Sequence, residues 1–210
     1  MRDLSHALGS GEPYPGDPPA AVTPHATMAA DGYRVSAVAC STHSGTHIDA
    51  PSHLLADGRS LDAFDVSAFR FDAHVVDCTG YGPGDAIPVD RVPALDDHDM
   101  VVFNTGTAAD WGRPEYYEHP HLSVAAAERC ADAGCAVAVD APSVDPTRTA
   151  PAGESSDAAA YPAHRALLGA GALIVENVTN LDGLPERVPV QAYPLPVAAD
   201  GAPARVIAAP

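Results

Sequence analysis

Three histidines and an aspartate that could bind a metal ion lie in one short segment, residues 43–53, which reads HSGTHIDAPSH. Its glycine, proline and β-branched residues disfavour a helix. In an extended chain side chains alternate between two faces, so His47 and Asp49 point to the same side. A straight strand would hold His43 roughly 13 Å from His47, too far to share an ion, so we expect a bend at Gly45. Two histidines and one carboxylate with open coordination positions suit Zn²⁺ or Mn²⁺.

Three further residues could complete this chemistry. His53 follows the group and is the candidate general acid/base, since an imidazole titrates near neutral pH. Glu176 lies in the apolar segment ALIVENV, residues 172–178. An unpaired carboxylate buried there would cost on the order of several kcal/mol or take up a proton, so we expect a metal ion or hydrogen bonds to hold it. His164 opens a helix-like segment and, with Glu176, could form a second metal position beside Asp49. The alternative to metal binding is that the histidines of residues 43–53 lie on a polar surface loop and that His164 lies on the surface of a helix.

Short apolar segments predict the strands that must position these residues, at residues 33–39, 73–78, 100–104, 135–140, 172–178 and 204–208. One helix is expected over residues 123–133, with Ser123 as its cap and Gly134 as its stop, and another over residues 163–169. Asp140 and Asp145 are expected in a turn after a strand, with a supporting role behind the metal site as the alternative. Trp111, Tyr116 and Tyr117 are expected in a core aromatic cluster, with a pocket wall or an oligomer interface as the alternative. Strands outnumber helices, which predicts a single mixed α/β domain, residues 1–210, with a substantial sheet.

The charge of the chain limits its partners. The sequence has 210 residues, 28 acidic and 11 basic, with a formal net charge of -17 and no lysine. Nucleic acids and anionic membranes would repel such a chain, so we expect a small-molecule substrate. The first residues lack the apolar core of a signal peptide, which predicts a cytoplasmic location, and the four cysteines are expected to be buried thiols.

The metal-binding segment resembles the signature of the cyclase family of metal-dependent hydrolases, whose best-known members are bacterial kynurenine formamidases. The family pattern His-x3-His-x-Asp-x3-His is matched by His43, His47, Asp49 and His53, with the core GTHIDAP intact at residues 45–51. Further similar segments are DLSH at residues 3–6, PYPGD at 13–17, NTG at 104–106, WG at 111–112, PEYY at 114–117, DAPSVD at 140–145 and residues 162–177. The resemblance therefore covers nearly the whole chain.

The resemblance implies a swivelling β/β/α fold, usually assembled as a homodimer or homotetramer. It implies one or two Zn²⁺ ions, with Mn²⁺ as a possible substitute. His43, His47 and Asp49 would bind the first ion and Asp49, His164 and Glu176 the second, with Glu176 contacting both. His53 takes the position of the catalytic acid/base, and Tyr14 stands where formamidases commonly have a tryptophan that contacts the substrate.

The implied reaction is metal-assisted hydrolysis of an amide, in which N-formylkynurenine yields kynurenine and formate. Tyr14 keeps an aromatic face but is smaller and adds a hydroxyl, so the preferred substrate could differ. The alternative within the family is a cyclic amide or lactone hydrolase that acts on substrates such as isatin. A metal-binding oligomer without turnover is a third hypothesis, which the loss of His53 or a ligand would favour.

Overall fold

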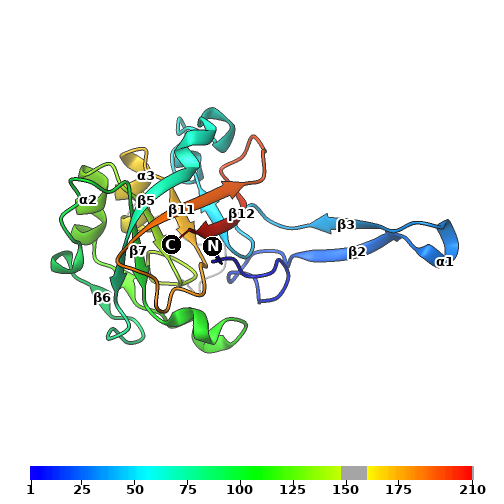
Figure 1. Cartoon of the computed structure of the whole chain (residues 1–210), viewed down its shortest axis with the longest axis horizontal. Helices are drawn as coiled ribbons and strands as arrows, with labels where there is room; N and C mark the ends of the chain where they lie inside the picture. Colours follow the sequence, from blue (N-terminus) through cyan, green and yellow to red (C-terminus); the bar gives the residue numbers. More distant parts are fainter. Residues whose placement is uncertain (148–159, 210) are drawn as a thin grey trace.

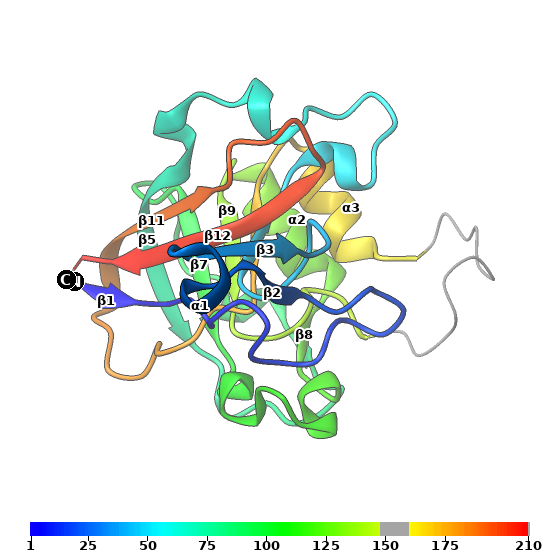
Figure 2. The same cartoon turned by 90° about the vertical axis from the view of Figure 1, so that its right-hand side faces the viewer.

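A closed ring of seven strands forms the centre of the fold in the computed structural model, which describes residues 1–147 and 160–209 (Figures 1 and 2). Within it β5, β7, β9 and β10 run parallel to one another, whereas every pairing made by β4, β11 or β12 is antiparallel. The sheet is therefore mixed, as predicted. In ring order the strands are β12 (Gly201–Ala208), β11 (Arg187–Pro194), β5 (Arg70–Asp77), β7 (Met100–Asn104), β9 (Ala136–Val139), β10 (Ile174–Glu176) and β4 (His47–Asp49), which pairs with β12 again.

Alternation along the strands produces two hydrophobic cores. On β7, Met100 and Val102 point into the barrel, whereas Val101 and Phe103 point outward. The outward side chains pack against α2 (Val124–Asp132) and α3 (Pro162–Gly169). The residues of β7 and β9 thus alternate between the barrel interior and the layer between barrel and helices, which explains why these two strands are apolar along nearly their whole length.

The two long helices begin where the sequence predicts. Ser123 caps α2 by accepting a hydrogen bond from the Ala126 amide, and Gly134 follows the helix with a φ of 70°. The predicted second helix is α3, which starts one residue earlier at Pro162, a position where the missing N–H costs nothing. None of the helices in the described residues is long and apolar enough to cross a membrane.

Short elements complete the fold. β1 (Arg2–Asp3) pairs with the end of β12, so the two chain termini lie side by side (Figure 2). β6 (Ala86–Ile87) pairs with β8 (His121–Leu122). Single turns of 3₁₀ helix are η1 (Pro51–His53), η2 (Leu61–Ala63), η3 (Val66–Phe69), η4 (Val89–Arg91), η5 (Thr107–Asp110) and η6 (Pro114–Tyr117).

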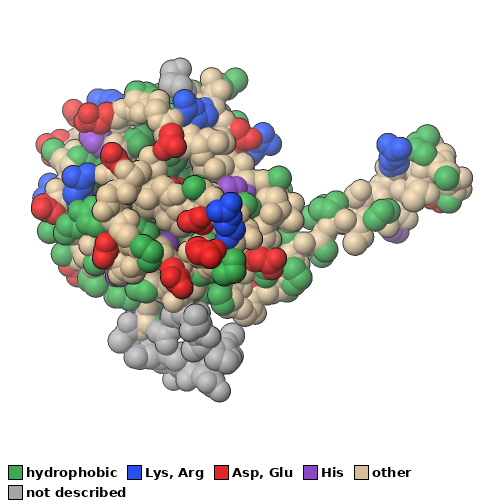
Figure 3. Space-filling view, turned by 90° about the horizontal axis from the view of Figure 1, so that it is seen from below, with side chains coloured by type: hydrophobic (Ala, Val, Ile, Leu, Met, Phe, Trp, Pro, Cys, Tyr) green, Lys and Arg blue, Asp and Glu red, His purple; other side chains and the backbone are tan. Residues whose placement is uncertain are grey.

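One hairpin leaves the body of the molecule and projects into solvent (Figures 1 and 3). It consists of β2 (Ala21–Ala26), α1 (Met28–Asp31) at its tip and β3 (Val35–Ala39), and we call residues 21–39 the arm. Every residue of the arm except Ala26 is exposed. The sequence predicted only β3, and it started that strand too early, at residue 33.

The other expected strands are all present, with ends that differ by up to three residues, but β2 and β11 were not predicted. Pro24 lies within β2 and Pro189 within β11, and an internal proline lowers the weight of a strand pattern. The four cysteines are free thiols, as expected; three are buried, and Cys40 is half-buried.

Closure of the barrel depends on a glycine. Gly201 of β12 lies opposite Asp49 of β4, and a methyl group there would lie 2.8 Å from His43 Cε1 and 3.0 Å from the Ile48 carbonyl oxygen. We expect Gly201→Ala to lower the free energy of unfolding by about 1–3 kcal/mol, because the added atom overpacks this contact. Urea denaturation of the metal-free protein measures the change.

Gly80→Ala is the matched control for this substitution, because a methyl group at Gly80 meets no atom within 4 Å. It should unfold at nearly the wild-type urea concentration. Equal stability of Gly201→Ala and Gly80→Ala would contradict the role assigned to Gly201.

Candidate metal centre

The metal-binding segment bends at the predicted glycine and then enters β4. Gly45 has a φ of +64°, which favours glycine, and the turn brings the His43 and His47 rings to 5.1 Å between centroids. Ile48 points into the barrel core, so His47 and Asp49 on either side of it point outward. Local strand geometry thus places the two polar side chains on one face.

Two other elements bring the downstream residues to the same face. Glu176 of β10 is the direct antiparallel partner of His47, and its Oε2 lies 3.4 Å from His47 Nε2. His164, in the first turn of α3, points its Nε2 to within 3.2 Å of Glu176 Oε1 and 3.7 Å of Asp49 Oδ2. The barrel and α3 therefore assemble His47, Asp49, His164 and Glu176 into one buried cluster.

Both buried histidines are held by their Nδ1 atoms. His47 Nδ1 donates to the Gly45 carbonyl at 2.9 Å, and His164 Nδ1 donates to Asp145 Oδ2 at 2.8 Å. Each Nε2 is thereby directed toward carboxylates, which is how metal-binding histidines are usually oriented. His47 Nε2 and Asp49 Oδ2 are buried with no hydrogen-bond partner in the described part of the chain, as expected of atoms that bind an ion.

The donor atoms form two overlapping groups that fit a divalent ion. His43, His47 and Asp49 offer one set of ligand atoms within 4.8 Å of one another, and Asp49, His164 and Glu176 offer a second set. Asp49 belongs to both, and the two Glu176 oxygens face His47 and His164 separately. Imidazole and carboxylate ligands suit Zn²⁺ and Mn²⁺, so the structure brings together all five residues expected to bind metal.

Opposite charges in the cluster stabilise one another against the cost of burial. Burial and the neighbouring Asp49 raise the pKa of Glu176, but His164 and His47 outweigh them and lower it to about 2. Burial by itself would lower the pKa of His47, but the neighbouring Asp49 and Glu176 outweigh burial and raise this pKa to about 10. His164 has a pKa well above its usual value for similar reasons. In the absence of an ion, imidazolium groups therefore neutralise the carboxylates.

His53 lies beside this cluster, at the end of η1, and is half-buried. Its ring is 4.1 Å from the His43 ring, and its Nδ1 is 3.3 Å from Asp200 Oδ2. The same Asp200 oxygen accepts a hydrogen bond from His43 Nε2 at 2.8 Å, while His43 Nδ1 donates to Asp49 at 2.8 Å. Burial lowers the pKa of His53 despite the opposing effect of Asp49, whereas the pKa values of His43, His47 and His164 are all raised.

Asp200 is the site residue that the sequence analysis missed, and Asp145 was given a role at the site only as an alternative. Asp200 ends the loop before β12, and no local pattern connects it with His43 and His53. Asp145 was expected in a turn after a strand. It does lie in a bend after β9, and it also takes the alternative role behind the metal site: its buried carboxylate accepts from the His164 ring and caps α3 through the amides of Ala163 and His164.

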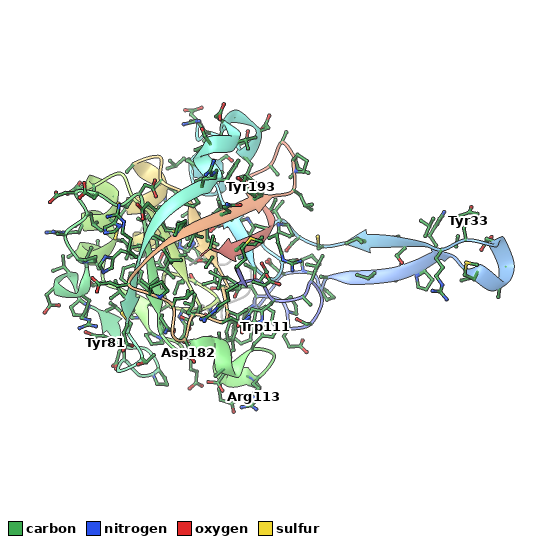
Figure 4. The ribbon with its side chains drawn as sticks, viewed as in Figure 1. Tyr33, Tyr81, Trp111, Arg113, Asp182 and Tyr193 are labelled. Carbon is green, nitrogen blue, oxygen red and sulfur yellow. The ribbon has the colours of Figure 1, made fainter. Side chains whose placement is uncertain are left out.

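A cavity of about 230 Å³ opens onto the cluster. It lies below the ~300–1,000 Å³ of pockets for drug-sized ligands, so it suits a small aromatic molecule. Tyr116 contacts both Trp111 and Tyr117 edge to face, as expected of an aromatic cluster. All three also line this cavity, as does Tyr14; Trp111 lies on the body of the molecule (Figure 4). The further lining residues include Glu12, Asp17 and Tyr161, whereas the described lining contains no lysine or arginine.

Asn177 connects the cavity wall to the metal-binding segment. Its side-chain amide donates to the Gly45 carbonyl at 2.8 Å, and its oxygen accepts from the Tyr116 hydroxyl at 2.7 Å. The Gly45 carbonyl that orients His47 is thus itself held in place. This arrangement fixes the aromatic wall relative to the cluster.

Comparison with known proteins agrees with this geometry. The family model described as a putative cyclase matches residues 2–146. A kynurenine formamidase from Salinibacter ruber is 33% identical over 175 residues, which cover 80% of this chain and 76% of that protein. A kynurenine formamidase from Delftia acidovorans is 31% identical over 215 residues, 98% of this chain and 95% of that protein.

Solved structures share the fold. An isatin hydrolase bound to the product analogue thioisatinate superposes with a TM-score of 0.84 at 20% identity, over 99% of this chain and 90% of that one. Isatin hydrolase A from Labrenzia aggregata superposes with a TM-score of 0.82 at 23% identity, over 99% and 92%. The matched family model and the curated relatives together show that the chain belongs to the cyclase family.

Proposed function

We propose that this protein is a metal-dependent hydrolase that cleaves the formamide bond of an aryl formamide, with N-formylkynurenine as the first candidate. The observation that carries the proposal is a buried His/Asp/Glu cluster, with unpartnered ligand atoms, that opens onto an aromatic cavity. Kynurenine formamidases among the relatives support the choice of substrate. The products are kynurenine and formate.

The ligand residues divide into the two groups described above. His43, His47 and Asp49 would hold a first ion, and Asp49, His164 and Glu176 a second. When bound, a divalent ion would polarise the substrate carbonyl and make water acidic enough to react near neutral pH. We propose Zn²⁺ as the native ion and Mn²⁺ as an active substitute, because both accept this mixture of imidazole and carboxylate ligands.

His53 moves the proton in this proposal. Its Nδ1 donates to Asp200, which leaves Nε2 to accept a proton, and its lowered pKa keeps it neutral at pH 7. It removes a proton from the attacking water and delivers it to the nitrogen of the departing aryl amine. Asp200 acts through His53 as a positioning residue, since it fixes the tautomer and orientation of the ring.

The cavity favours a substrate with one aromatic ring. Its tyrosines and Trp111 offer faces and edges against which the ring can stack, and Glu12 and Asp17 could pair with an ammonium group such as that of N-formylkynurenine. Apart from the histidines of the cluster, the described lining has no basic side chain, and so no lysine or arginine to pair with a carboxylate. That feature favours a second candidate, a neutral cyclic amide such as isatin.

Replacement of His53 by alanine tests the central assignment. We expect His53→Ala to lower kcat for N-formylkynurenine by about 10²- to 10⁴-fold, because a general acid/base contributes that much, while the bound metal content stays unchanged. Hydrolysis of N-formylkynurenine, isatin and a simple aryl formamide should be followed with Zn²⁺-loaded and Mn²⁺-loaded protein.

His98→Ala, which removes another half-buried histidine, should keep wild-type turnover. Turnover of isatin without turnover of N-formylkynurenine would replace the first candidate by the second. If neither wild-type protein nor control hydrolysed any of the three compounds with metal bound, the amidase proposal would be wrong.

Replacement of Asp200 tests the positioning of His53. We expect Asp200→Asn to lower kcat by about 10- to 100-fold with little change in KM, as is typical when the partner of a site histidine is lost. Loss of the negative charge also lowers the pKa of His53, because the hydrogen bond to Asp200 raises it. The acidic limb of the kcat/KM profile should therefore shift to lower pH.

Asp132→Asn, at the exposed end of α2, serves as the control and should leave both kcat and the pH profile unchanged. An unshifted acidic limb in Asp200→Asn would show that Asp200 does not act on His53.

Metal binding should become tighter as pH rises from about 6 to 9, since a bound ion displaces protons. The pKa of His47 is raised to about 10, so this ring is protonated in the metal-free protein at neutral pH and must lose its proton. Calorimetric titration with Zn²⁺ in two buffers of different protonation enthalpy measures the protons released.

His47→Gln should release fewer protons and bind more weakly, whereas His25→Gln, on the exposed arm, should match the wild type. Affinity that does not depend on pH would contradict the protonated state of the cluster.

A further inference from the structure

A third set of metal-binding side chains lies on the solvent side of the buried cluster. His43, His53 and Asp200 each offer a ligand atom, and these three atoms lie within 4.8 Å of one another. His43 Nε2 is 2.8 Å and His53 Nδ1 is 3.3 Å from the same Asp200 oxygen, Oδ2. Zinc bound tetrahedrally at about 2.0 Å holds neighbouring ligand atoms roughly 3.3 Å apart, so small side-chain movements would admit an ion. We call these three residues the outer site.

The backbone positions the outer site before any ion binds. The Ala50 amide donates to the Asp200 carbonyl at 2.8 Å, and the Ala50 carbonyl accepts from the His53 amide at 2.9 Å. The His43 ring lies against Gly201, where a methyl group would approach its Cε1 to 2.8 Å. Fixed strand and turn residues therefore hold all three ligands close together.

Ions from solvent reach the outer site more easily than they reach the buried cluster. The side chains of His43, His53 and Asp200 are 17%, 29% and 39% exposed, whereas no side chain of the buried cluster is more than 6% exposed. The net charge of -17 also attracts cations to the protein. The outer site is thus open to free ions even after the cluster has been filled.

His43 is shared with the first set of ligands described above, and this makes the outer site the weaker one. Its Nδ1 faces Asp49, whereas its Nε2 faces Asp200. A neutral imidazole has one nitrogen free to bind an ion, so His43 serves either the inner ion or the outer ion. Beside a filled cluster the outer ion keeps only His53 and Asp200 as ligands. We therefore expect the outer site to fill when metal is in excess and to stay empty at stoichiometric loading.

An ion at the outer site would change which ring nitrogen of His53 carries the proton. In the structure Nδ1 donates to Asp200, and Nε2 is left to accept. An ion bound to Nδ1 displaces that proton to solvent, and Nε2 takes up one in its place, so the ring stays neutral with no net exchange of protons. Nε2 then donates instead of accepting. In that state His53 is unable to take a proton from water.

We propose that His43, His53 and Asp200 form an inhibitory site for a divalent ion such as Zn²⁺, in addition to the two positions of the proposed catalytic ions. The inference rests on the proposed function, because inhibition acts by blocking the acid/base role of His53. Zn²⁺ should bind there more tightly than Mn²⁺, since sites with imidazole ligands bind zinc more strongly than manganese. Excess Zn²⁺ thus inhibits the enzyme, whereas excess Mn²⁺ does not.

Counting bound ions tests whether the outer site exists. The protein is equilibrated with buffered free Zn²⁺, from the amount that fills the cluster to a large excess, and the bound zinc is measured. In excess Zn²⁺ the wild type should bind one more ion per chain than Asp200→Asn, because a neutral amide is a much poorer ligand for zinc than a carboxylate. Asp132→Asn, at the exposed end of α2, is the matched control and should bind as many ions as the wild type.

Turnover tests the inhibition. Excess Zn²⁺ should slow the Zn²⁺-loaded wild type by at least about 10-fold, because it removes a general acid/base, and a weak chelator should restore the rate. An equal excess of Mn²⁺ should leave the rate nearly unchanged. The residual turnover of Asp200→Asn should not respond to excess Zn²⁺.

His98→Ala controls for zinc bound elsewhere. His74 Nδ1 and His98 Nε2 lie 3.4 Å apart, which is also suitable for two ligands of one zinc ion. This variant should be inhibited by excess Zn²⁺ as strongly as the wild type.

Equal ion counts in the wild type and Asp200→Asn overturn the proposal. Wild-type turnover that does not fall in excess Zn²⁺ also overturns it, as does equal inhibition of Asp200→Asn. If circular dichroism shows that Asp200→Asn is unfolded, the count is made with His53→Gln, which removes another ligand. Failure of the outer site leaves turnover at stoichiometric Zn²⁺ intact. If no compound is hydrolysed at any zinc level, the proposed function and the inhibitory role fail together, and the ion count still decides whether the outer site exists.

Discussion

Two carboxylates, Asp49 and Glu176, are buried on the neighbouring strands β4 and β10, and the groups that face them are histidines. Unpaired, such charges would destabilise the fold, so positively charged groups must surround them. The rest of the site meets this requirement: Gly45 turns the chain so that His43 reaches Asp49, and Asp145 orients His164 toward Glu176. A doubly charged ion bound there would take over the role of the imidazolium protons.

The short strand β4 connects this charge constraint with the architecture. It lies between β10 and β12 and closes the barrel. Its outward side chains therefore lie where the parallel strands of the sheet meet the antiparallel ones. β10 contributes Glu176 on one side, while β12 contributes Gly201, whose lack of a side chain leaves space for the His43 ring. The same closure brings Asp200 to His53. A catalytic arrangement thus depends on backbone contacts between segments that are far apart in sequence.

Which site residues could be predicted depends on whether their contacts lie within one short segment or join segments that are far apart in sequence. The alternation that places His47 and Asp49 together and the bend at Gly45 are local, and the sequence was sufficient to predict them. Glu176 was identifiable because a carboxylate in an apolar strand requires a partner. Asp200 was not, because its contacts with His43 and His53 exist only once the barrel has closed. In the arm, β3 was predicted but β2 was not: Pro24 interrupts β2, and since this strand buries no face it lacks the hydrophobic alternation that marks a strand.

The point at which the arm joins the body has a consequence for catalysis. Ala20 and Ser41, just outside the two ends of the arm, line the cavity, although no residue of the arm does so. A contact that restrains the arm therefore restrains the rim of the cavity. Thermodynamic linkage makes such an effect reciprocal: a ligand that orders the rim of the cavity also restrains the arm, by the same free energy.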